Sequence, residues 1–174
     1  MAVMRYATRD DIPAINDIVN YYIRETYINW SWEERPLEDA YAWLEGHALP
    51  HHPVYVIEED GQILAFGSLS PFRPKKGYWP VVENSVYTRP ECRGRGFGTM
   101  LMRQLIDDAK AAGLWAITAW ITDDNTDSIR FHEKLGFAHT GTMPGVGEKW
   151  GKRLGVVIMQ MDLTEGTNEQ RICG

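Results

Sequence analysis

The sequence predicts an α/β fold with a mixed sheet, and three features lead to that prediction. Apolar runs of strand length alternate with segments whose apolar residues recur at helical spacing. Two strand-like runs, 54–58 and 63–70, flank Asp60-Gly61, a dipeptide typical of a hairpin turn. A third run, 81–88, enters a glycine-rich stretch, and a helical pattern leaves it. Strands interleaved with helices, together with a hairpin, favour a sheet with both parallel and antiparallel pairs.

The individual elements follow from local patterns. Thr8 and Asp11 have the spacing of a capping box, and Pro13 falls within the first turn, so a helix should begin here. Gly113 and Gly136 directly follow helical patterns, where a glycine often ends a helix. The patterns predict helices over 8–24, 36–44, 99–112 and 126–135, and strands over 3–7, 54–58, 63–70, 81–88, 115–121, 137–142 and 152–163.

Four segments lack a clear period and are expected to be loops: 25–36, 46–53, 70–80 and 143–151. The first is rich in aromatic residues, which suit either core packing or the wall of a binding pocket. The second carries three histidines between glycine and prolines, without cysteine or acidic residues at ligand spacing. Solvated histidines are therefore favoured over a metal site.

Length, composition and charge limit the classes of protein to consider. The 174 residues fit one domain, predicted over 1–163, with a polar tail over 164–174. The net charge of −6 and the pI of about 5.4 speak against an extended nucleic-acid footprint. No apolar run is long enough to cross a bilayer, and the N-terminus lacks the apolar core of a secretion signal. With two cysteines and no sign of a disulfide framework, a cytoplasmic protein is expected.

The glycine-rich stretch 93–99 is the strongest candidate for a ligand site. Its glycines permit close backbone approach, and the unpaired N–H groups of the following helix favour an anion. Two arginines add cationic forks that match phosphate geometry. The stretch lacks the Gly-Lys-Ser/Thr that ends a Walker A loop, and its G-x-G-x-G spacing differs from the G-x-G-x-x-G of a Rossmann fingerprint. Two interpretations of this stretch remain open: a cradle for a pyrophosphate, or a glycine-rich turn with solvated arginines. Its sequence is Arg93-Gly94-Arg95-Gly96-Phe97-Gly98-Thr99.

Three motifs in order resemble the GNAT superfamily of acetyl-CoA-dependent N-acetyltransferases. The stretch 93–98 fits its Q/R-x-x-G-x-G/A signature, and 125–137 is similar to its second cofactor motif. Upstream, Val-Glu-Asn-Ser-Val-Tyr at 82–87 resembles the branch of phosphinothricin and methionine sulfone (sulfoximine) acetyltransferases. The resemblance runs from about Met4 to Leu163.

The resemblance implies a central, mostly antiparallel sheet flanked by helices, with two splayed strands that admit the cofactor. It further implies acetyl-CoA as co-substrate, no metal, and a homodimer. Backbone N–H groups around Val86 and Tyr87 would bind the pantetheine and polarise the thioester carbonyl. Backbone groups from Arg93 to Thr99 would hold the pyrophosphate. Asn125 and Ser128 would contact the cofactor arm, although Asn125 is also a plausible helix cap.

Two residues are candidates for proton transfer. Glu83 lies in a strand otherwise rich in valine, where burial would raise the pKa of a base. From the residues alone, an edge-strand or ion-paired glutamate is an alternative, but the matching glutamate of the branch is the proposed base. His132 stands where many relatives have a tyrosine thought to protonate the thiolate. A histidine can donate near neutral pH, and the alternative is a helix histidine held by packing.

Three residues are candidates for the acceptor pocket. Trp30 matches an aromatic position of the branch, Arg73 can offer a bidentate fork to a carboxylate, and Lys149 matches a loop near the acceptor site and dimer interface. Arg73 and Lys149 have the alternative of exposed, solvated side chains. The chain departs from its relatives at Trp79, where a second arginine is frequent, and at Gly155, where an aspartate is frequent.

The predicted function is acetyl transfer to the α-amino group of a small amino-acid-like acceptor, such as phosphinothricin, methionine sulfoximine or methionine sulfone, by direct attack in a ternary complex. Alternatives within the same class are a polyamine, an aminoglycoside or a protein N-terminus as acceptor. A non-catalytic acyl-CoA-binding module is the alternative from another class. Neither nucleic acid nor a membrane is expected as a partner.

Overall fold

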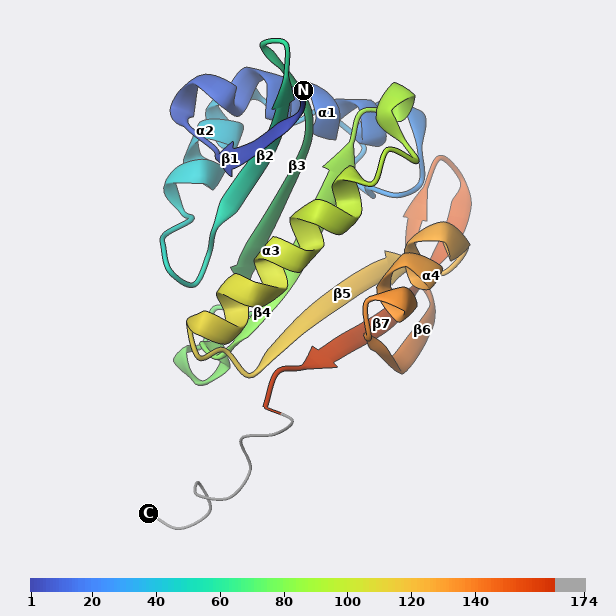
Figure 1. Cartoon of the computed structure of the whole chain (residues 1–174). Coiled ribbons are helices and arrows are strands. Elements are labelled where there is room, and N and C mark those ends of the chain that lie inside the picture. Colours follow the sequence, from blue (N-terminus) through green and yellow to red (C-terminus); the bar gives the residue numbers. More distant parts are fainter. Residues whose placement is uncertain (165–174) are drawn as a thin grey trace.

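A computed structural model describes residues 1–164 and shows one sheet flanked by helices (Figure 1). The strands follow the order β1-β2-β3-β4-β5-β7-β6 across the sheet. Apart from its first residue, the predicted polar tail, 164–174, lies outside the described residues. Within residues 1–164, no helix combines the length and hydropathy that a membrane span requires.

The chain alternates between strands and helices, as predicted. The strands are β1 (Val3–Tyr6), β2 (Val54–Glu59), β3 (Gln62–Pro71), β4 (Val81–Thr88), β5 (Ala116–Thr122), β6 (Ala138–Lys149) and β7 (Lys152–Asp162). The α-helices are α1 (Ile12–Glu25), α2 (Leu37–Glu45), α3 (Phe97–Ala111) and α4 (Thr126–Lys134), and short 3₁₀ turns cover Arg9–Asp11, Lys76–Tyr78 and Pro90–Cys92.

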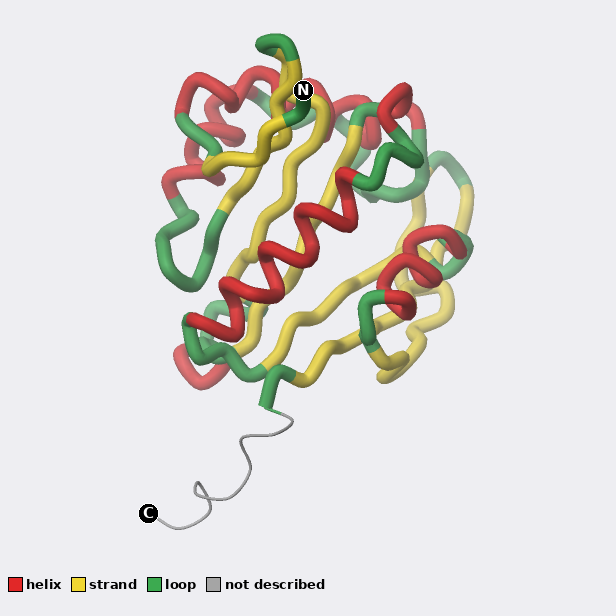
Figure 2. The backbone as a smooth tube through the Cα atoms, in the orientation of Figure 1, coloured by secondary structure: helices red, strands yellow, loops and turns green. Residues whose placement is uncertain are grey.

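The sheet consists of two antiparallel halves joined by one short parallel contact. Strands β1 to β4 pair antiparallel in sequence order. In the other half β7 lies between β5 and β6 and pairs antiparallel with both. Between the halves, β4 and β5 pair in parallel only from Val81 to Glu83, opposite Ala116 to Thr118. Beyond these residues the two strands separate, as the tube in Figure 2 shows. The mixed, mostly antiparallel sheet with two splayed strands is therefore confirmed.

Helices cover both faces of the sheet, and each face has its own apolar core. Helix α3 crosses one face, and its buried residues join those of β3, β4 and β5, with α4 at the edge of the same cluster (Figure 1). Helices α1 and α2 cover the other face of the β1–β4 half. Apolar burial on both faces explains why the strand segments read as nearly continuous apolar runs.

Turn chemistry decides several boundaries. Asp60 and Gly61 both have positive φ, 51° and 77°, as the predicted hairpin requires. Gly113 and Gly136, at 71° and 95°, end helical segments where predicted. Asp11 accepts a hydrogen bond from the backbone N–H of Thr8 at 2.7 Å, which is one half of the capping box.

Two of the loop predictions are wrong in part. Segment 143–151 is mostly strand, because β6 continues to Lys149 and takes up extra residues in two register shifts. Only Trp150 and Gly151 form the turn, with φ of 51° and 77°. His47 is not solvated, since Nδ1 lies 2.6 Å from the carbonyl oxygen of Trp43 and Nε2 lies 2.9 Å from Oγ of Ser70.

Candidate active site

A cleft of about 670 Å³ opens where β4 and β5 separate. Past Glu83, β4 pairs with β3 alone, so the side of the strand that faces the cleft has no neighbouring strand. Such an edge offers backbone N–H and C=O groups to an extended ligand. The lining includes almost all of the predicted cofactor and proton-transfer residues, namely Glu83, Val86, Tyr87, Arg93, Gly94, Gly96, Phe97, Gly98, Thr99, Asn125, Ser128 and His132.

One end of the cleft is suited to a phosphate. Gly94 and Gly96 have φ of 79° and 82°, a region that favours glycine, and they turn the chain into α3. Gly96 is the N-cap residue and has no side chain to occupy the first N–H groups of the helix. The backbone of Phe97, Gly98 and Thr99 therefore presents free donors at the positive end of the helix dipole, which meets the requirement of a pyrophosphate.

The two arginines of this stretch behave differently. Arg93 lines the cleft, with its guanidinium 3.3 Å from Oη of Tyr22 and 5.5 Å from the ring centroid. Arg95 instead pairs with Glu59 on β2 at 2.7 Å and stacks over Phe97. Its side chain is absent from the cleft lining, so the pair of cationic forks expected from the sequence is reduced to Arg93.

On the opposite wall, Asn125 and Ser128 stand at the start of α4. The side chain of Asn125 accepts a hydrogen bond from the backbone N–H of Ser128 at 3.2 Å, which confirms the predicted helix cap. Both residues also line the cleft, so the cap leaves them available to a ligand there.

Glu83 lies at the other end, at the last parallel pair of β4 and β5. Burial raises the pKa of its half-buried carboxyl group, and the guanidinium of Arg73, 4.0 Å away, opposes that rise. Arg73 is held above the rings of Phe72 and Trp120, 4.3 and 4.8 Å from their centroids. A carboxylate of raised pKa and a cation thus lie side by side, an arrangement able to take a proton beside an anionic group.

His132 enters the cleft from α4 and is 6% exposed. Its Nδ1 lies 2.8 Å from the carbonyl oxygen of Ser128, and its Nε2 lies 3.2 Å from Oδ1 of Asn84. Burial lowers the pKa of the imidazole, while the hydrogen bond to Ser128 raises it. Asn84 in turn donates to the carbonyl oxygen of Thr118 on β5 at 3.0 Å.

Trp30 and Lys149 lie behind the cleft wall. Nε1 of Trp30 donates to Oγ1 of Thr122 at 2.9 Å, and Thr122 is a lining residue. The Trp30 ring packs so closely on Gly147 that a Cβ there would lie 2.4 Å from it.

Lys149 is fully buried, contrary to a solvated or acceptor-contacting side chain. Its ammonium donates to the carbonyl oxygens of Ile23, Thr26 and Asn29 at 2.5, 2.7 and 2.6 Å. These bonds join the β6–β7 hairpin to the end of α1 and to the aromatic segment that follows. Lys149 therefore positions this segment rather than lining the cleft.

Among the lining residues that were not identified from the sequence, Asn84 and Trp120 contact predicted site residues. Asn84 is a polar residue on the otherwise apolar strand face that it shares with Val82 and Val86, and that contrast was the available signal. Trp120 lines the cleft and supports Arg73, yet it resembled an ordinary core residue of an apolar strand.

The two departures from the family pattern have different structural settings. Trp79 is 58% exposed and lies outside the cleft lining, with its ring 6.0 Å from that of His51. At Gly155, a Cβ would lie 2.3 Å from a carboxylate oxygen of Asp123. The Asp123 carboxylate thus occupies the space of a side chain at 155.

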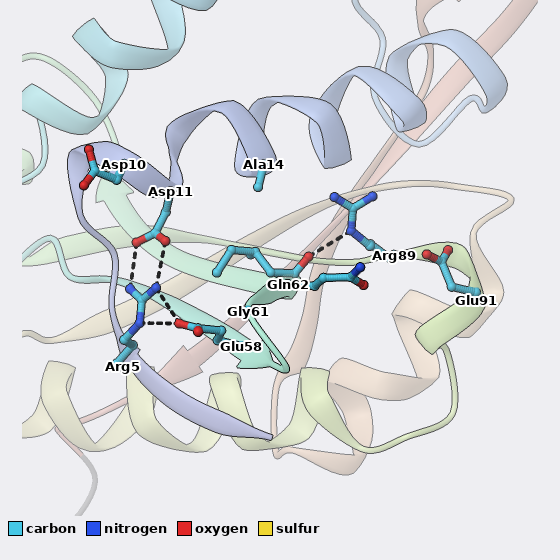
Figure 3. A pocket seen from close by; sticks show the side chains of 10 residues that line it. Arg5, Asp10, Asp11, Ala14, Glu58, Gly61, Gln62, Arg89 and Glu91 are labelled. Carbon is cyan, nitrogen blue, oxygen red and sulfur yellow. Dashed lines mark hydrogen bonds and ion pairs between the residues drawn. The ribbon is translucent and has the colours of Figure 1, made fainter. Parts of the chain in front are cut away.

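A second hollow, of about 460 Å³, lies at the β1–β2 side of the molecule (Figure 3). Arg5 donates to Asp11 at 2.7 and 2.8 Å and to Glu58 at 2.9 Å, and Arg89 donates to the carbonyl oxygen of Ile63 at 2.8 Å. Arg5 also lowers the pKa of Asp11. The hydrogen bonds are internal and tie two strands to the start of α1, so this hollow is structural.

No group of three or more histidine, cysteine or acidic side chains suited to a metal ion occurs within residues 1–164. The cleft offers instead a phosphate cradle, an unpaired strand edge, a half-buried carboxylate and a buried imidazole. Together with the splayed sheet, these features define an enzyme that binds an extended phosphorylated co-substrate and transfers a group at its far end.

Comparison with known proteins identifies the family. The sequence model of the acetyltransferase (GNAT) family matches residues 15–137, and the chain belongs to that family. It is 35% identical to the L-amino acid N-acyltransferase MnaT of Escherichia coli, over 97% of this chain and 98% of that protein. It is 36% identical to an L-methionine sulfoximine/L-methionine sulfone acetyltransferase of Salmonella typhimurium, over 93% and 95% of the two chains.

The solved structures agree with this membership. A phosphinothricin acetyltransferase of Sinorhizobium meliloti, in complex with acetyl-CoA, superposes with a TM-score of 0.91 at 28% identity. The match covers 97% of this chain and 92% of that one. The predicted class, an acetyl-CoA-dependent N-acetyltransferase, and the predicted fold are thereby confirmed.

Proposed function

We propose that this protein transfers the acetyl group of acetyl-CoA to the α-amino group of a small amino-acid-like acceptor, of the methionine sulfoximine, methionine sulfone or phosphinothricin type. The observation that carries the acceptor class is the 4.0 Å separation of Glu83 and Arg73. In an α-amino acid the ammonium and the carboxylate are neighbours on one carbon. A base and a guanidinium placed side by side match both groups at once.

Each side chain then has a defined task. Glu83 takes a proton from the acceptor ammonium, directly or through water, and leaves the amine free to attack the thioester. Arg73 binds the acceptor carboxylate and fixes the amine near Glu83. His132 gives a proton to the departing thiolate. The nitrogen loses two protons between ammonium and amide, one before attack and one from the tetrahedral intermediate. One equivalent reaches the sulfur through His132, and the other leaves to solvent through Glu83, so the reaction releases one proton.

The strand edge and the helix start would hold acetyl-CoA. The stretch of β4 around Val86 and Tyr87 borders the cleft, and its backbone groups that point away from β3 suit the pantetheine and the thioester carbonyl. The backbone from Gly94 to Thr99, with Arg93, suits the pyrophosphate, and Asn125 and Ser128 suit the arm between them.

Trp30 and Lys149 serve the acceptor end indirectly in this proposal. Both tie the segment between α1 and α2 to the second half of the sheet. That segment would then form the outer wall of the acceptor pocket in a fixed position.

The proposal includes a homodimer and a cytoplasmic location. Trp32, Val146 and Trp150 are 60%, 49% and 44% exposed, and Trp32 donates to the backbone of the β6–β7 hairpin. Large exposed apolar groups at one site suit a subunit contact. Analytical ultracentrifugation should give a molecular mass near twice the 19.9 kDa of one chain. A free, buried Cys92 suits a reducing compartment.

Substitution of Arg73 tests the acceptor class. Arg73→Ala should raise KM for L-methionine sulfone roughly 10- to 100-fold, because a charged hydrogen bond is lost, and leave KM for acetyl-CoA unchanged. The decarboxylated analogue of the acceptor should react poorly with the parent enzyme and equally poorly with the variant. Arg103→Ala, an exposed arginine on α3, is the matched control. Equal loss with both acceptors would exclude Arg73 as the carboxylate anchor.

A further inference from the structure

A buried hydrogen-bonded chain bridges the strands at the point where they separate. It runs from His132 on α4 through Asn84 on β4 to Thr118 on β5, and these side chains are 6%, 9% and 4% exposed. The first contact, from Nε2 to Oδ1, measures 3.2 Å, and the second, from Nδ2 to the Thr118 carbonyl oxygen, measures 3.0 Å. These hydrogen bonds link β4 to β5 at Asn84, one residue beyond the last paired residue of β4, Glu83.

The orientation of the Asn84 amide follows from its partners. The carbonyl oxygen of Thr118 accepts only, so the NH₂ group of Asn84 must face it. The amide oxygen then faces Nε2 of His132. Rotating the amide by half a turn would place two acceptor oxygens, Oδ1 of Asn84 and the carbonyl oxygen of Thr118, 3.0 Å apart.

The imidazole therefore faces an acceptor at each nitrogen. Nδ1 lies 2.8 Å from the carbonyl oxygen of Ser128 and 3.4 Å from its hydroxyl oxygen, and Nε2 faces the amide oxygen of Asn84. A neutral imidazole carries one N–H and satisfies one of these contacts, whereas an imidazolium carries two and satisfies both. Because the amide oxygen of Asn84 only accepts, a ring that satisfies it carries a proton on Nε2, whether the imidazole is neutral or charged.

No charged side chain competes for this assignment within residues 1–164. The rings of Phe131 and Phe137 stand edge-on to the imidazole, at 5.2 and 5.0 Å between centroids. The charged residues of the cleft lining are Glu83, Arg93 and Asp127, and none of them bonds to the ring. The amide of Asn84 is thus the group that opposes the effect of burial at Nε2.

We propose that Asn84 is a positioning residue that keeps a proton on Nε2 of His132, inside the cleft between β4 and β5. Strand alternation gives the arrangement a further consequence, because Glu83 and Asn84 point to opposite faces of β4. The base and the group that supports the acid are neighbours in sequence, yet they serve opposite sides of the reacting thioester. This catalytic consequence depends on the proposed function, whereas the protonation of His132 does not.

The test is the titration of His132 in the free, ¹⁵N-labelled enzyme, followed by NMR of the imidazole nitrogens and assigned with His132→Phe. Asn84→Asp places a carboxylate at Nε2 and should raise the titration midpoint by about one pH unit or more. Asn84→Leu removes the acceptor and should lower the midpoint by about as much. The signals of the other four of the five histidines should not move.

Asn20→Asp, on α1, controls for the added charge and should leave His132 unchanged. In turnover assays, activity falls at high pH as His132 loses its proton, and in Asn84→Leu this fall should begin at a lower pH than in the parent. KM for acetyl-CoA should stay the same. If the isosteric Asn84→Asp folds and the midpoint stays within about 0.3 pH unit of the parent, the proposal is wrong. This readout needs no acceptor, so it stands or falls independently of the proposed reaction.

Discussion

Glu83→Gln should lower kcat at least about 100-fold and leave the affinity for acetyl-CoA within about twofold. Glutamine keeps the size of the side chain but cannot accept a proton from the ammonium. Burial raises the pKa of Glu83, so parent activity should fall as pH decreases through that raised value, because the protonated carboxyl is no base. Initial rates across pH and calorimetric binding of acetyl-CoA measure both parts.

Two companion variants sharpen this result. Arg73→Ala removes the cation that holds the pKa of Glu83 down, so the acid limb of its pH profile should move to higher pH. Glu38→Gln, an exposed glutamate on α2, should behave as the parent enzyme. A Glu83→Gln enzyme with near-parental kcat at every pH would remove Glu83 from the mechanism.

Lys149→Met should lower the free energy of unfolding by about 3–5 kcal/mol, because three buried carbonyl groups lose their donor. Methionine fills a similar volume but leaves the carbonyl oxygens of Ile23, Thr26 and Asn29 buried without their shared donor. The midpoint of thermal unfolding should fall by roughly 10 °C. Urea denaturation of parent and variant gives the free energies directly.

Lys152→Met is the matched control, since Lys152 lies across the same hairpin and pairs with Asp124 while 44% exposed. It should cost about 1 kcal/mol or less. Losses of equal size for Lys149→Met and Lys152→Met would mean that the three carbonyl contacts do not stabilise the fold. Activity should fall with the first variant alone, because it releases the aromatic segment that we propose as the wall of the acceptor pocket.

Local chemistry made much of the fold predictable. Asp60-Gly61 and Gly113 adopt the positive φ that their sequence contexts require, and Asn125 caps α4. The turn into α3 was equally predictable, since Gly94 and Gly96 adopt conformations that favour glycine. These features depend on residues close in sequence, where pattern and conformation are directly coupled.

The remaining features depend on contacts between distant segments. Lys149 resembled a solvated loop residue because its carbonyl partners lie more than a hundred residues upstream. Arg95 resembled a phosphate ligand because Glu59, its partner on β2, is 36 residues away. Asn84 acquires its role only from the separation of β4 and β5, which no local pattern encodes.

The most direct test of the proposed reaction is the initial rate of thiol release from acetyl-CoA with a panel of acceptors. We predict saturable turnover with L-methionine sulfone, L-methionine sulfoximine and phosphinothricin, and little with spermidine, which has no carboxylate for Arg73. Turnover with spermidine alone would contradict the acceptor pocket. Tight binding of acetyl-CoA without thiol release on any member of the panel would contradict the proposed acetyl transfer itself.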